Sequence, residues 1–369
     1  MKVPFLDLKA PYQELKTDFD AAYKRVMESG WFIMGEEVEA FEREFAAYCG
    51  VKHCIGVGNG LEALHLVLRA YDIGEGDEVI VPANTYIATW LAVSYAGAKP
   101  VPIEPDPRTY NLDPTLIAAA ITPKTKAIMP VHIYGQPADM DPIMQVAEEN
   151  NLIIIEDAAQ AHGARYKGRM CGTLSHAAGY SFYPGKNLGA FGDAGAIVTN
   201  DDNAAEQTRM LHNYGSKVKY NHEMKGFNSR LDEMLAALLR VKLVHLNEWN
   251  EHRQKIASYY LNNLADLPGL VLPYVPDWAS PSWHIFAIQY QGRDDLQKYL
   301  KNKGVGTLIH YPVPPHLSRA YAELGMQKGA FPISETIASL ELSLPIGPHL
   351  SLEGAEYVVN AIQEFFSKV

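Results

Sequence analysis

The chain has 369 residues, of which 47% are hydrophobic and 20% are charged, a composition that excludes a disordered or fibrous protein. Its 32 Lys and Arg against 43 Asp and Glu give a net charge of −11, so the broad basic surface that nucleic acid requires is not expected. An anionic ligand would have to be held by local features. The length suits a large α/β domain followed by a smaller one.

The three cysteines, Cys49, Cys54 and Cys171, are too few and too scattered for a disulfide framework or a zinc site, so no bound metal is expected. The amino-terminal residues lack the apolar segment of a secretion signal. No run reaches the roughly 18 apolar residues that a membrane-spanning helix needs. We therefore expect a soluble protein of the reducing cytoplasm without a membrane partner.

In chain order, strand patterns alternate with helical patterns over the first two thirds of the sequence. Apolar residues at helical spacing predict helices over 36–49, 61–71, 113–121 and 140–150. Short apolar runs predict strands at 54–57, 78–81, 100–104, 126–132, 152–156 and 177–182. Strands joined by helical crossovers form a largely parallel sheet covered on both faces. Such sheets bind ligands at the carboxyl ends of their strands, so functional residues are expected in the loops that follow them.

The last third of the chain has its own α/β pattern. A long helical pattern covers 230–264, a strand pattern covers 285–290, and helical patterns cover 294–303 and 352–368. We therefore predict a large domain at 1–250 and a small C-terminal domain at 251–369, with a long helix bridging the two.

A glycine-rich turn, GVGNG at 56–60, opens the predicted helix at 61–71. The dinucleotide-binding fingerprint needs its third glycine one residue later, where Leu61 stands, so a nicotinamide cofactor is disfavoured. The turn can still present backbone N–H groups and the positive end of a helix dipole to an anion such as phosphate. A plain tight turn is the alternative interpretation.

A second motif, EDAAQAHG at 156–163, follows the apolar strand at 152–156. A carboxylate at the end of a buried strand must be paired, because an isolated buried charge is costly. The cationic ring nitrogen of a cofactor would be such a partner for Asp157. The alternative is an aspartate that caps the next segment.

A third motif, SFYPGKNLG at 181–189, places Lys186 on a tight loop directly after a strand. A desolvated lysine can lose its proton and attach covalently to a carbonyl compound. A solvated surface lysine is the alternative for this motif alone. The combination with Asp157 favours the functional interpretation.

These motifs, with Thr85-Tyr86 between the first and the second, resemble the DegT/StrS-type sugar-nucleotide aminotransferases. That family uses pyridoxal 5'-phosphate (PLP) and has the aspartate aminotransferase fold. The resemblance runs from about Pro4 to the last predicted helix. It implies a fold type I PLP enzyme, with a mostly parallel central sheet flanked by helices and a smaller C-terminal α/β domain.

The resemblance also implies residue roles. Asp157 would pair with the pyridine nitrogen of PLP, Lys186 would carry the cofactor and move protons, and Gln160 would reach the ring hydroxyl. Tyr86 would stack on the ring. The phosphate is expected at Ser181 and at the backbone amides of Gly60 and Leu61. Many relatives have Ser-Gly-Thr where this chain has Asn-Gly-Leu at 59–61, so backbone donors would carry more of the phosphate contact.

Asn228, within GFNSRL at 226–231, matches an asparagine that in the family reaches the phosphate of the other subunit. This implies a homodimer with two shared active sites. The expected substrates are L-glutamate and a dTDP-keto-sugar. Because the chain is acidic, local cations must hold the nucleotide. The candidate substrate-binding residues are Tyr183, Lys219, Arg230 and His310.

Finer similarity concerns the sugar. The lysine loop and the segment IHYP at 309–312, with PPH at 314–316, resemble members that aminate C-3 of dTDP-3-keto-6-deoxyhexoses and give dTDP-3-amino-3,6-dideoxyhexoses. Amination at C-4 is one alternative, and a non-enzymatic regulatory protein that retains the fold is another. Sugar dehydratases of the same fold have histidine at the lysine position, and Lys186 argues against that reaction.

Overall fold

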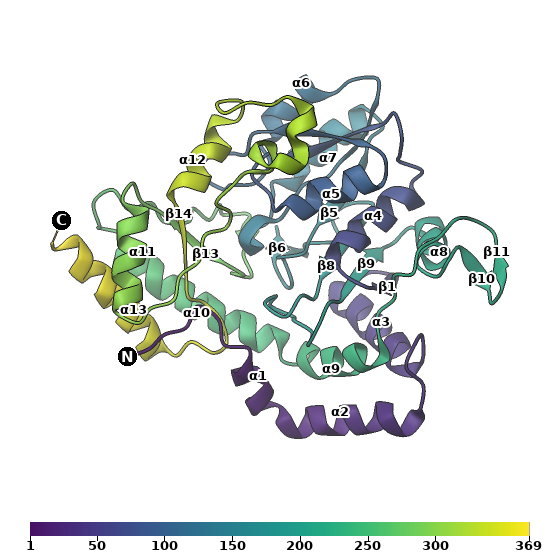
Figure 1. Cartoon of the computed structure of the whole chain (residues 1–369), viewed down its shortest axis with the longest axis horizontal. Helices are drawn as coiled ribbons and strands as arrows, with labels where there is room; N and C mark the ends of the chain where they lie inside the picture. The colour runs from purple at the N-terminus through teal and green to yellow at the C-terminus, as the bar shows by residue number, and fades with distance from the viewer. Residues whose placement is uncertain (369) are drawn as a thin grey trace.

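The structure is a computed structural model that describes residues 1–368. Its centre is a sheet that, within these residues, has seven strands in the order β1-β9-β8-β5-β4-β2-β3 (Figure 1). Neighbours from β3 to β8 pair in parallel, whereas β9 is antiparallel to β8 and β1. The predicted, mostly parallel sheet is therefore confirmed. The strands are β1 His53–Val57, β2 Glu78–Pro82, β3 Lys99–Ile103, β4 Thr125–Ile128, β5 Ile153–Asp157, β8 Ala177–Ser181 and β9 Gly195–Thr199.

The sequence pattern does not predict β9. This short segment begins with a glycine and follows a glycine-rich loop, so its pattern resembles a continuation of that loop. In the structure its β-branched residues pack in the sheet between β1 and β8. Gly195 faces both Val57 of β1 and Ser181 of β8. This pairing places the glycine turn after β1 close to the end of β8, at the same edge of the sheet.

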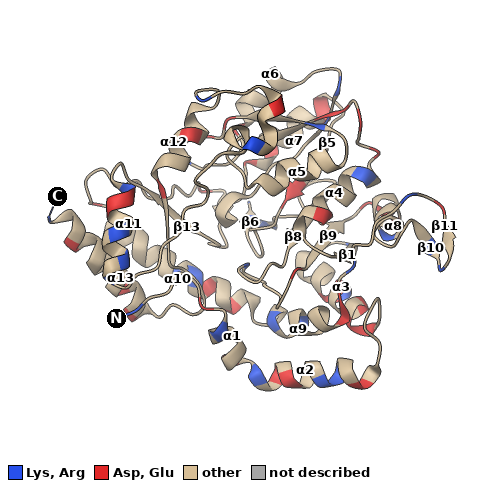
Figure 2. Cartoon of the chain, viewed as in Figure 1, with Lys and Arg blue, Asp and Glu red and all other residues tan. Residues whose placement is uncertain are grey.

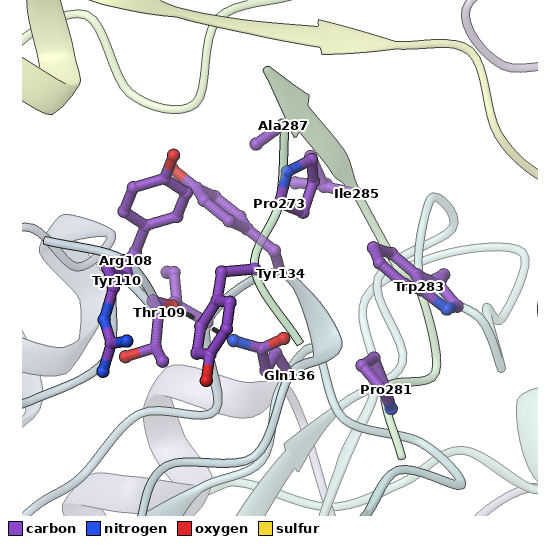
Figure 3. A pocket seen from close by; sticks show the side chains of 12 residues that line it. Arg108, Thr109, Tyr110, Tyr134, Gln136, Pro273, Pro281, Trp283, Ile285 and Ala287 are labelled. Atoms are coloured by element: carbon purple, nitrogen blue, oxygen red, sulfur yellow. Dashed lines mark hydrogen bonds between the residues drawn. The ribbon is translucent and has the colours of Figure 1, made fainter. Parts of the chain in front are cut away.

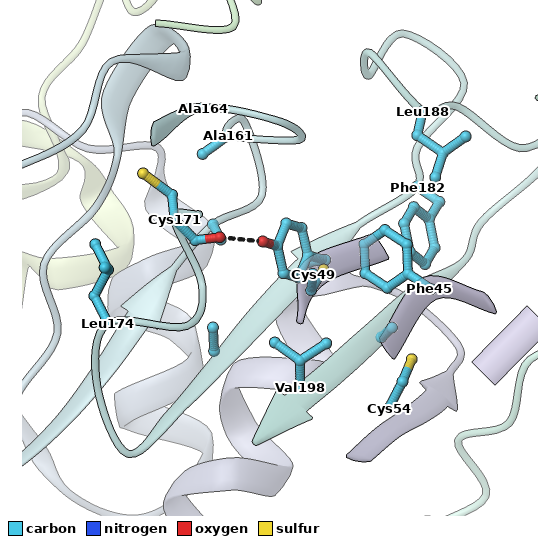
Figure 4. Packing of buried hydrophobic residues seen from close by; sticks show 14 of the residues in the cluster. Phe45, Cys49, Cys54, Ala161, Ala164, Cys171, Leu174, Phe182, Leu188 and Val198 are labelled. Atoms are coloured by element: carbon cyan, nitrogen blue, oxygen red, sulfur yellow. Dashed lines mark hydrogen bonds between the residues drawn. The ribbon is translucent and has the colours of Figure 1, made fainter. Parts of the chain in front are cut away.

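Two hydrophobic clusters sandwich this sheet. One packs under α3, α7 and α9, and the other under α4, α5 and α8. Figure 4 shows part of the first cluster, where Phe45 of α3 lies near Phe182 and the hydroxyl of Tyr180 bonds to the carbonyl of Cys171. The helices of this large part are α1 Lys9–Glu14, α2 Lys16–Ser29, α3 Glu36–Cys49, α4 Gly60–Ala70, α5 Ile87–Tyr95, α6 Ile117–Ala120, α7 Met140–Glu149, α8 Asp202–Leu211 and α9 Glu233–Leu243.

The local sequence explains the two elements next to the glycine turn. In α3, Val38, Phe41 and Phe45 recur at helical spacing and are buried, and the helix ends at Gly50 with a left-handed φ of 80°. Helix α4 is buried on nearly every side. The side chain of Asn59 caps it by accepting from the backbone N–H of Glu62 at 2.9 Å.

The C-terminal part has a separate hydrophobic cluster, formed by residues between Ile256 and Phe365 together with Val3. Its antiparallel strands β13 and β14 pair Phe286 with Leu344. Residue 250 lies inside α10, so the predicted boundary falls within a helix and the division into two domains stays a prediction. The elements are α10 Leu246–Leu264, β13 Phe286–Gln289, α11 Arg293–Asn302, α12 Pro332–Leu340, β14 Glu341–Leu344 and α13 Leu352–Phe366.

Two predicted elements are corrected. The single helix over 230–264 is wrong, since α9 ends at Leu243 and α10 begins at Leu246. The break lets the first helix pack on the sheet cluster and the second on the C-terminal cluster. The strand at 126–132 ends at Ile128, because the chain turns through the buried residues 129–132 towards the cavity described below.

The remaining pairs are small: β6 Arg165–Tyr166 lies between β7 Arg169–Met170 and β12 Ala279–Ser280, and β10 Ser216–Val218 forms a hairpin with β11 Asn221–His222. Acidic and basic side chains alternate along α2 (Figure 2), where Lys16 pairs with Asp20 four residues later. Among the described residues, no helix is long and apolar enough to cross a membrane.

Candidate active site

A cavity of about 700 Å³ opens at the carboxyl ends of the central strands. One wall comes from the ends of β5 and β8 and from the turn after β1, and the opposite wall comes from the C-terminal part. Most of the sequence-predicted site residues line this cavity: Gly60, Leu61, Tyr86, Asp157, Gln160, Ser181, Tyr183, Lys186 and His310.

Asp157, the last residue of β5, is buried at the floor of the cavity. Its carboxylate accepts hydrogen bonds from the Thr89 hydroxyl at 2.8 Å and from the Ala159 backbone N–H at 3.1 Å. Burial raises the pKa of Asp157, and these two hydrogen bonds and the nearby Lys186 act in the opposite direction. The carboxylate is therefore fixed in place by neutral donors, and it can still pair with a cationic ring.

Lys186 lies on the loop after β8 and lines the same cavity. Burial lowers the pKa of its ammonium group to about 8, although the charge of Asp157 raises it. Asn187 secures the loop by donating to the Asn250 side chain at 2.9 Å and to the Ser282 carbonyl at 2.8 Å. The amine is thus held on a hydrogen-bonded loop, and it loses its proton more readily than a solvated lysine does, as a nucleophile or base requires.

The glycine turn forms a close approach between two strands. A Cβ atom at Gly60 would lie 2.6 Å from the Cβ of Ser181, so only glycine fits there. Gly60 and Leu61 open helix α4, and the first N–H groups of a helix have no partner within it. Together with the Ser181 side chain they form a cradle of donors that suits a phosphate group.

Gln160 is fixed at both ends of its side chain. Its Oε1 accepts from the Tyr134 backbone N–H at 2.5 Å, and its Nε2 donates to the Tyr311 hydroxyl at 2.9 Å. The amide nitrogen has a second hydrogen for a ligand. The ring of Tyr311 lies 5.0 Å from that of Tyr86. These two aromatic rings border the cavity beside Gln160.

The sequence analysis missed the residues that hold His310. The Ser343 hydroxyl donates to the buried Glu341 carboxylate, and it lies 2.8 Å from His310 Nδ1. Ser343 Oγ thus links His310 Nδ1 to the carboxyl group of Glu341, whose pKa is raised to about 8 by burial. Burial lowers the pKa of His310 to about 4. The imidazole is therefore neutral and offers a hydrogen-bond acceptor.

Three predicted residues do not line the cavity. Lys219 lies in the turn of the β10–β11 hairpin, which projects from the body in Figure 1. Arg230 donates to the Asn213 side chain at 3.1 Å, and Asn228 is exposed. Their roles remain predictions.

Other residues at the site carried no sequence signal. Thr89 donates to Asp157 from 68 positions away, and Arg253 lines the cavity from α10.

A second, smaller hollow lies on the far side of Ile133 and Ile285, which border both spaces, and Figure 3 shows its mostly apolar lining. Among residues 1–368, no group of His, Cys, Asp and Glu is arranged to hold a metal ion.

The residues present fit PLP. Asp157 is a buried carboxylate without a bonded cationic partner in the described chain. Burial lowers the pKa of the Lys186 amine, and the absence of a side chain at Gly60 lets the backbone at the start of α4 approach Ser181. A carboxylate, an amine and an anion cradle around one cavity, at the strand ends of a mostly parallel sheet, define a fold type I PLP enzyme.

Comparison with known proteins places the chain within that class. The family model described as DegT/DnrJ/EryC1/StrS aminotransferase matches residues 13–363. The chain belongs to this family of PLP-dependent aminotransferases.

Three curated relatives match nearly the full length of the chain. The erythromycin biosynthesis sensory transduction protein EryC1 of Saccharopolyspora erythraea is 55% identical, over 98% of this chain and 99% of that protein. The dTDP-3-amino-3,4,6-trideoxy-α-D-glucose transaminase of Streptomyces venezuelae is 55% identical, over 100% and 97%. The dTDP-3-amino-3,6-dideoxy-α-D-galactopyranose transaminase of Aneurinibacillus thermoaerophilus is 53% identical, over 98% and 99%.

A solved structure agrees with the computed one over its whole length. The crystal structure of S. venezuelae DesV in complex with a ketimine intermediate superimposes with a TM-score of 0.98 at 55% identity, covering 100% of this chain and 99% of that one.

Proposed function

We propose that this aminotransferase moves an amino group from L-glutamate to C-3 of a dTDP-3-keto-6-deoxyhexose. The products are 2-oxoglutarate and a dTDP-3-amino-3,6-dideoxyhexose. The observation that carries the proposal is the cavity that joins Asp157 and Lys186, in a chain 55% and 53% identical to two transaminases named for dTDP-3-amino sugars.

Asp157, Lys186 and His310 have different roles in this reaction. When bound, PLP supplies an electron sink and stores the amino group between the two half-reactions. Asp157 keeps the ring nitrogen protonated through an ionic hydrogen bond. Lys186 takes the proton from the amino-bearing carbon of glutamate, and in the second half-reaction it delivers a proton to the sugar carbon. The neutral His310 accepts a hydrogen bond from a sugar hydroxyl.

We further propose a homodimer with shared active sites. Asn228 would reach the phosphate of the other subunit, and Lys219 and Arg230 would supply cations for the nucleotide. The exposed apolar segment Trp31 to Met34 supports this assembly, because such contiguous patches mark interaction surfaces.

The separate C-terminal hydrophobic cluster supports domains at 1–250 and 251–369. The three free cysteines support a cytoplasmic location.

The test is the position of the new amino group. Purified PLP-loaded protein is incubated with L-glutamate and a panel of dTDP-linked 3-keto and 4-keto sugars, and the product is assigned by two-dimensional NMR. We expect nitrogen at C-3, and no product from a Lys186→Ala control. Nitrogen at C-4 would establish the alternative regiochemistry. No turnover of any sugar would favour a regulatory role.

A further inference from the structure

Arg253 is a buried cation in the wall of the active-site cavity. It lies on α10, lines the cavity, and is 3% exposed. Burial lowers the pKa of its guanidinium group to about 10, and no acidic group of the described chain offsets this effect. A buried charge without a counter-ion is costly, so such groups are normally paired.

The guanidinium group is oriented by backbone oxygens alone. Its Nη1 donates to the carbonyls of Trp283 at 3.0 Å, Ile346 at 3.2 Å and His284 at 3.5 Å. Its Nε is buried without any acceptor in the described chain. Since a guanidinium has five N–H donors in a rigid fork, Arg253 is held at Nη1, Nε is enclosed by the protein, and Nη2 is the nitrogen left for an anion.

The position of Arg253 shows which anion suits it. His284, whose carbonyl it contacts, also bonds through its ring to the side chain of Asn187, the residue after Lys186. The cation therefore lies on the Lys186 side of the cavity, whereas the phosphate cradle is at Gly60 and Ser181. An amino acid carries its carboxylate on the very carbon that Lys186 deprotonates. A sugar nucleotide carries its diphosphate on C-1, which is separated from a C-3 keto carbon by C-2, and it has no carboxylate on the reacting carbon.

We propose that Arg253 is the binding residue for a carboxylate of the amino-acid donor. Its fork matches the planar, two-oxygen geometry of a carboxylate. This assignment deepens the proposed function and rests on it for the presence of a dicarboxylic donor. Both half-reactions share Lys186, but only the donor half-reaction uses Arg253.

The experiment measures the two half-reactions separately in the holoenzyme, as single turnovers. For Arg253→Met we expect the glutamate concentration that gives half-maximal rate to rise about 10- to 100-fold, the range for losing a charged hydrogen bond. The concentration dependence on the keto-sugar, measured with the aminated enzyme, should stay within about threefold. A matched control is Lys242→Met, a buried cation that bonds to the Gly189 carbonyl near the lysine loop.

A second readout is the binding of glutarate, which carries two carboxylates and has no amino group to transfer. Isothermal titration should show binding to wild type and Lys242→Met and its loss in Arg253→Met. If Arg253→Met does not fold, Arg253→Lys replaces it. We expect an intermediate loss, because the charge remains and the fork does not.

The outcomes are separable. An equal change in both half-reactions, or undiminished glutarate binding to Arg253→Met, would overturn the assignment and leave the proposed function standing. A change confined to the keto-sugar would assign Arg253 to the diphosphate instead. Arg253-dependent glutarate binding in an enzyme that aminates no sugar would retain the assignment and refute the proposed function.

Discussion

The floor of the cavity differs in construction from the segment 219–230, which lies outside the cavity lining and which we call the rim. On the floor, Asp157 and Gln160 are buried and hydrogen-bonded at both ends of their side chains. On the rim, Asn228 is exposed, and Tyr220 of the hairpin is 84% exposed. The proton-transfer groups are thus preorganised within one chain, whereas Asn228 and Lys219, predicted to contact phosphate and nucleotide, are exposed. Changes on the floor should therefore abolish chemistry, and changes on the rim should affect assembly and affinity.

The largest effect is expected on the floor, for Lys186→Ala. Loss of a positioned acid–base group costs about 10²- to 10⁴-fold in rate, and here the covalent attachment of PLP is lost as well. The variant should still bind PLP through Asp157 and the phosphate cradle, which absorbance after gel filtration would show. Borohydride treatment should fix the cofactor to wild type only. Activity within tenfold of wild type would remove Lys186 from the mechanism.

A smaller loss, of about 10- to 100-fold, is expected for Asp157→Asn, because an ionic hydrogen bond to the ring nitrogen becomes a neutral one. Thr89→Val sharpens the comparison. It removes a neutral donor to Asp157 and should cost about two- to tenfold. Single-turnover rates with glutamate measure both variants. A loss below tenfold in Asp157→Asn would count against the electron-sink role of the pair.

Mixed dimers test the rim, and we expect a twofold loss of activity relative to the wild-type dimer. One subunit carries Lys186→Ala and the other carries Asn228→Ala. If Asn228 acts across the interface, both changes fall in one site, the other site is wild type, and the heterodimer has about half of wild-type activity. If Asn228 acts within its own chain, each site carries one change. A heterodimer without a wild-type-like site would disprove the shared-site arrangement.

The last test measures stability instead of activity, and it concerns pH and the buried ring of His162 behind the floor. Both ring nitrogens lack a partner in the described chain, and burial lowers the pKa of His162 to about 3. A lowered pKa gives stability that is present above the unfolded value of 6.5 and is lost as pH falls towards 3. His162→Leu should therefore gain about 2 kcal/mol over wild type between pH 7 and pH 5. Urea unfolding at both pH values measures it. If the free energy of unfolding falls equally in the two proteins between pH 7 and pH 5, His162 does not titrate on unfolding.

The sequence predicted the floor better than the rim, for physical reasons. Asp157 is the last residue of one strand and Lys186 lies in the loop after another, so local pattern alone places them at the edge of the sheet. Thr89, Arg253 and Ser343 become visible only when distant segments meet, as in the bond between Thr89 and Asp157. Asn228 lies in a motif, but its predicted contact is with the phosphate of a second subunit, and the predicted contacts of Lys219 and Arg230 are with a nucleotide. Strand β9 was not predicted because glycines precede it. In the sheet it lies between β1 and β8.

The position of β9 also constrains the order in which the protein can be made. Within residues 1–368, the one strand that pairs with β1 is β9, with His53 facing Thr199, and pairing between such distant segments forms late and slowly. While a ribosome is still adding residues before Gly195, β1 and the glycine turn after it have no place in the sheet. A nascent chain shorter than this cannot hold PLP, so the cell must complete more than half of the polypeptide before the cofactor can help to stabilise it.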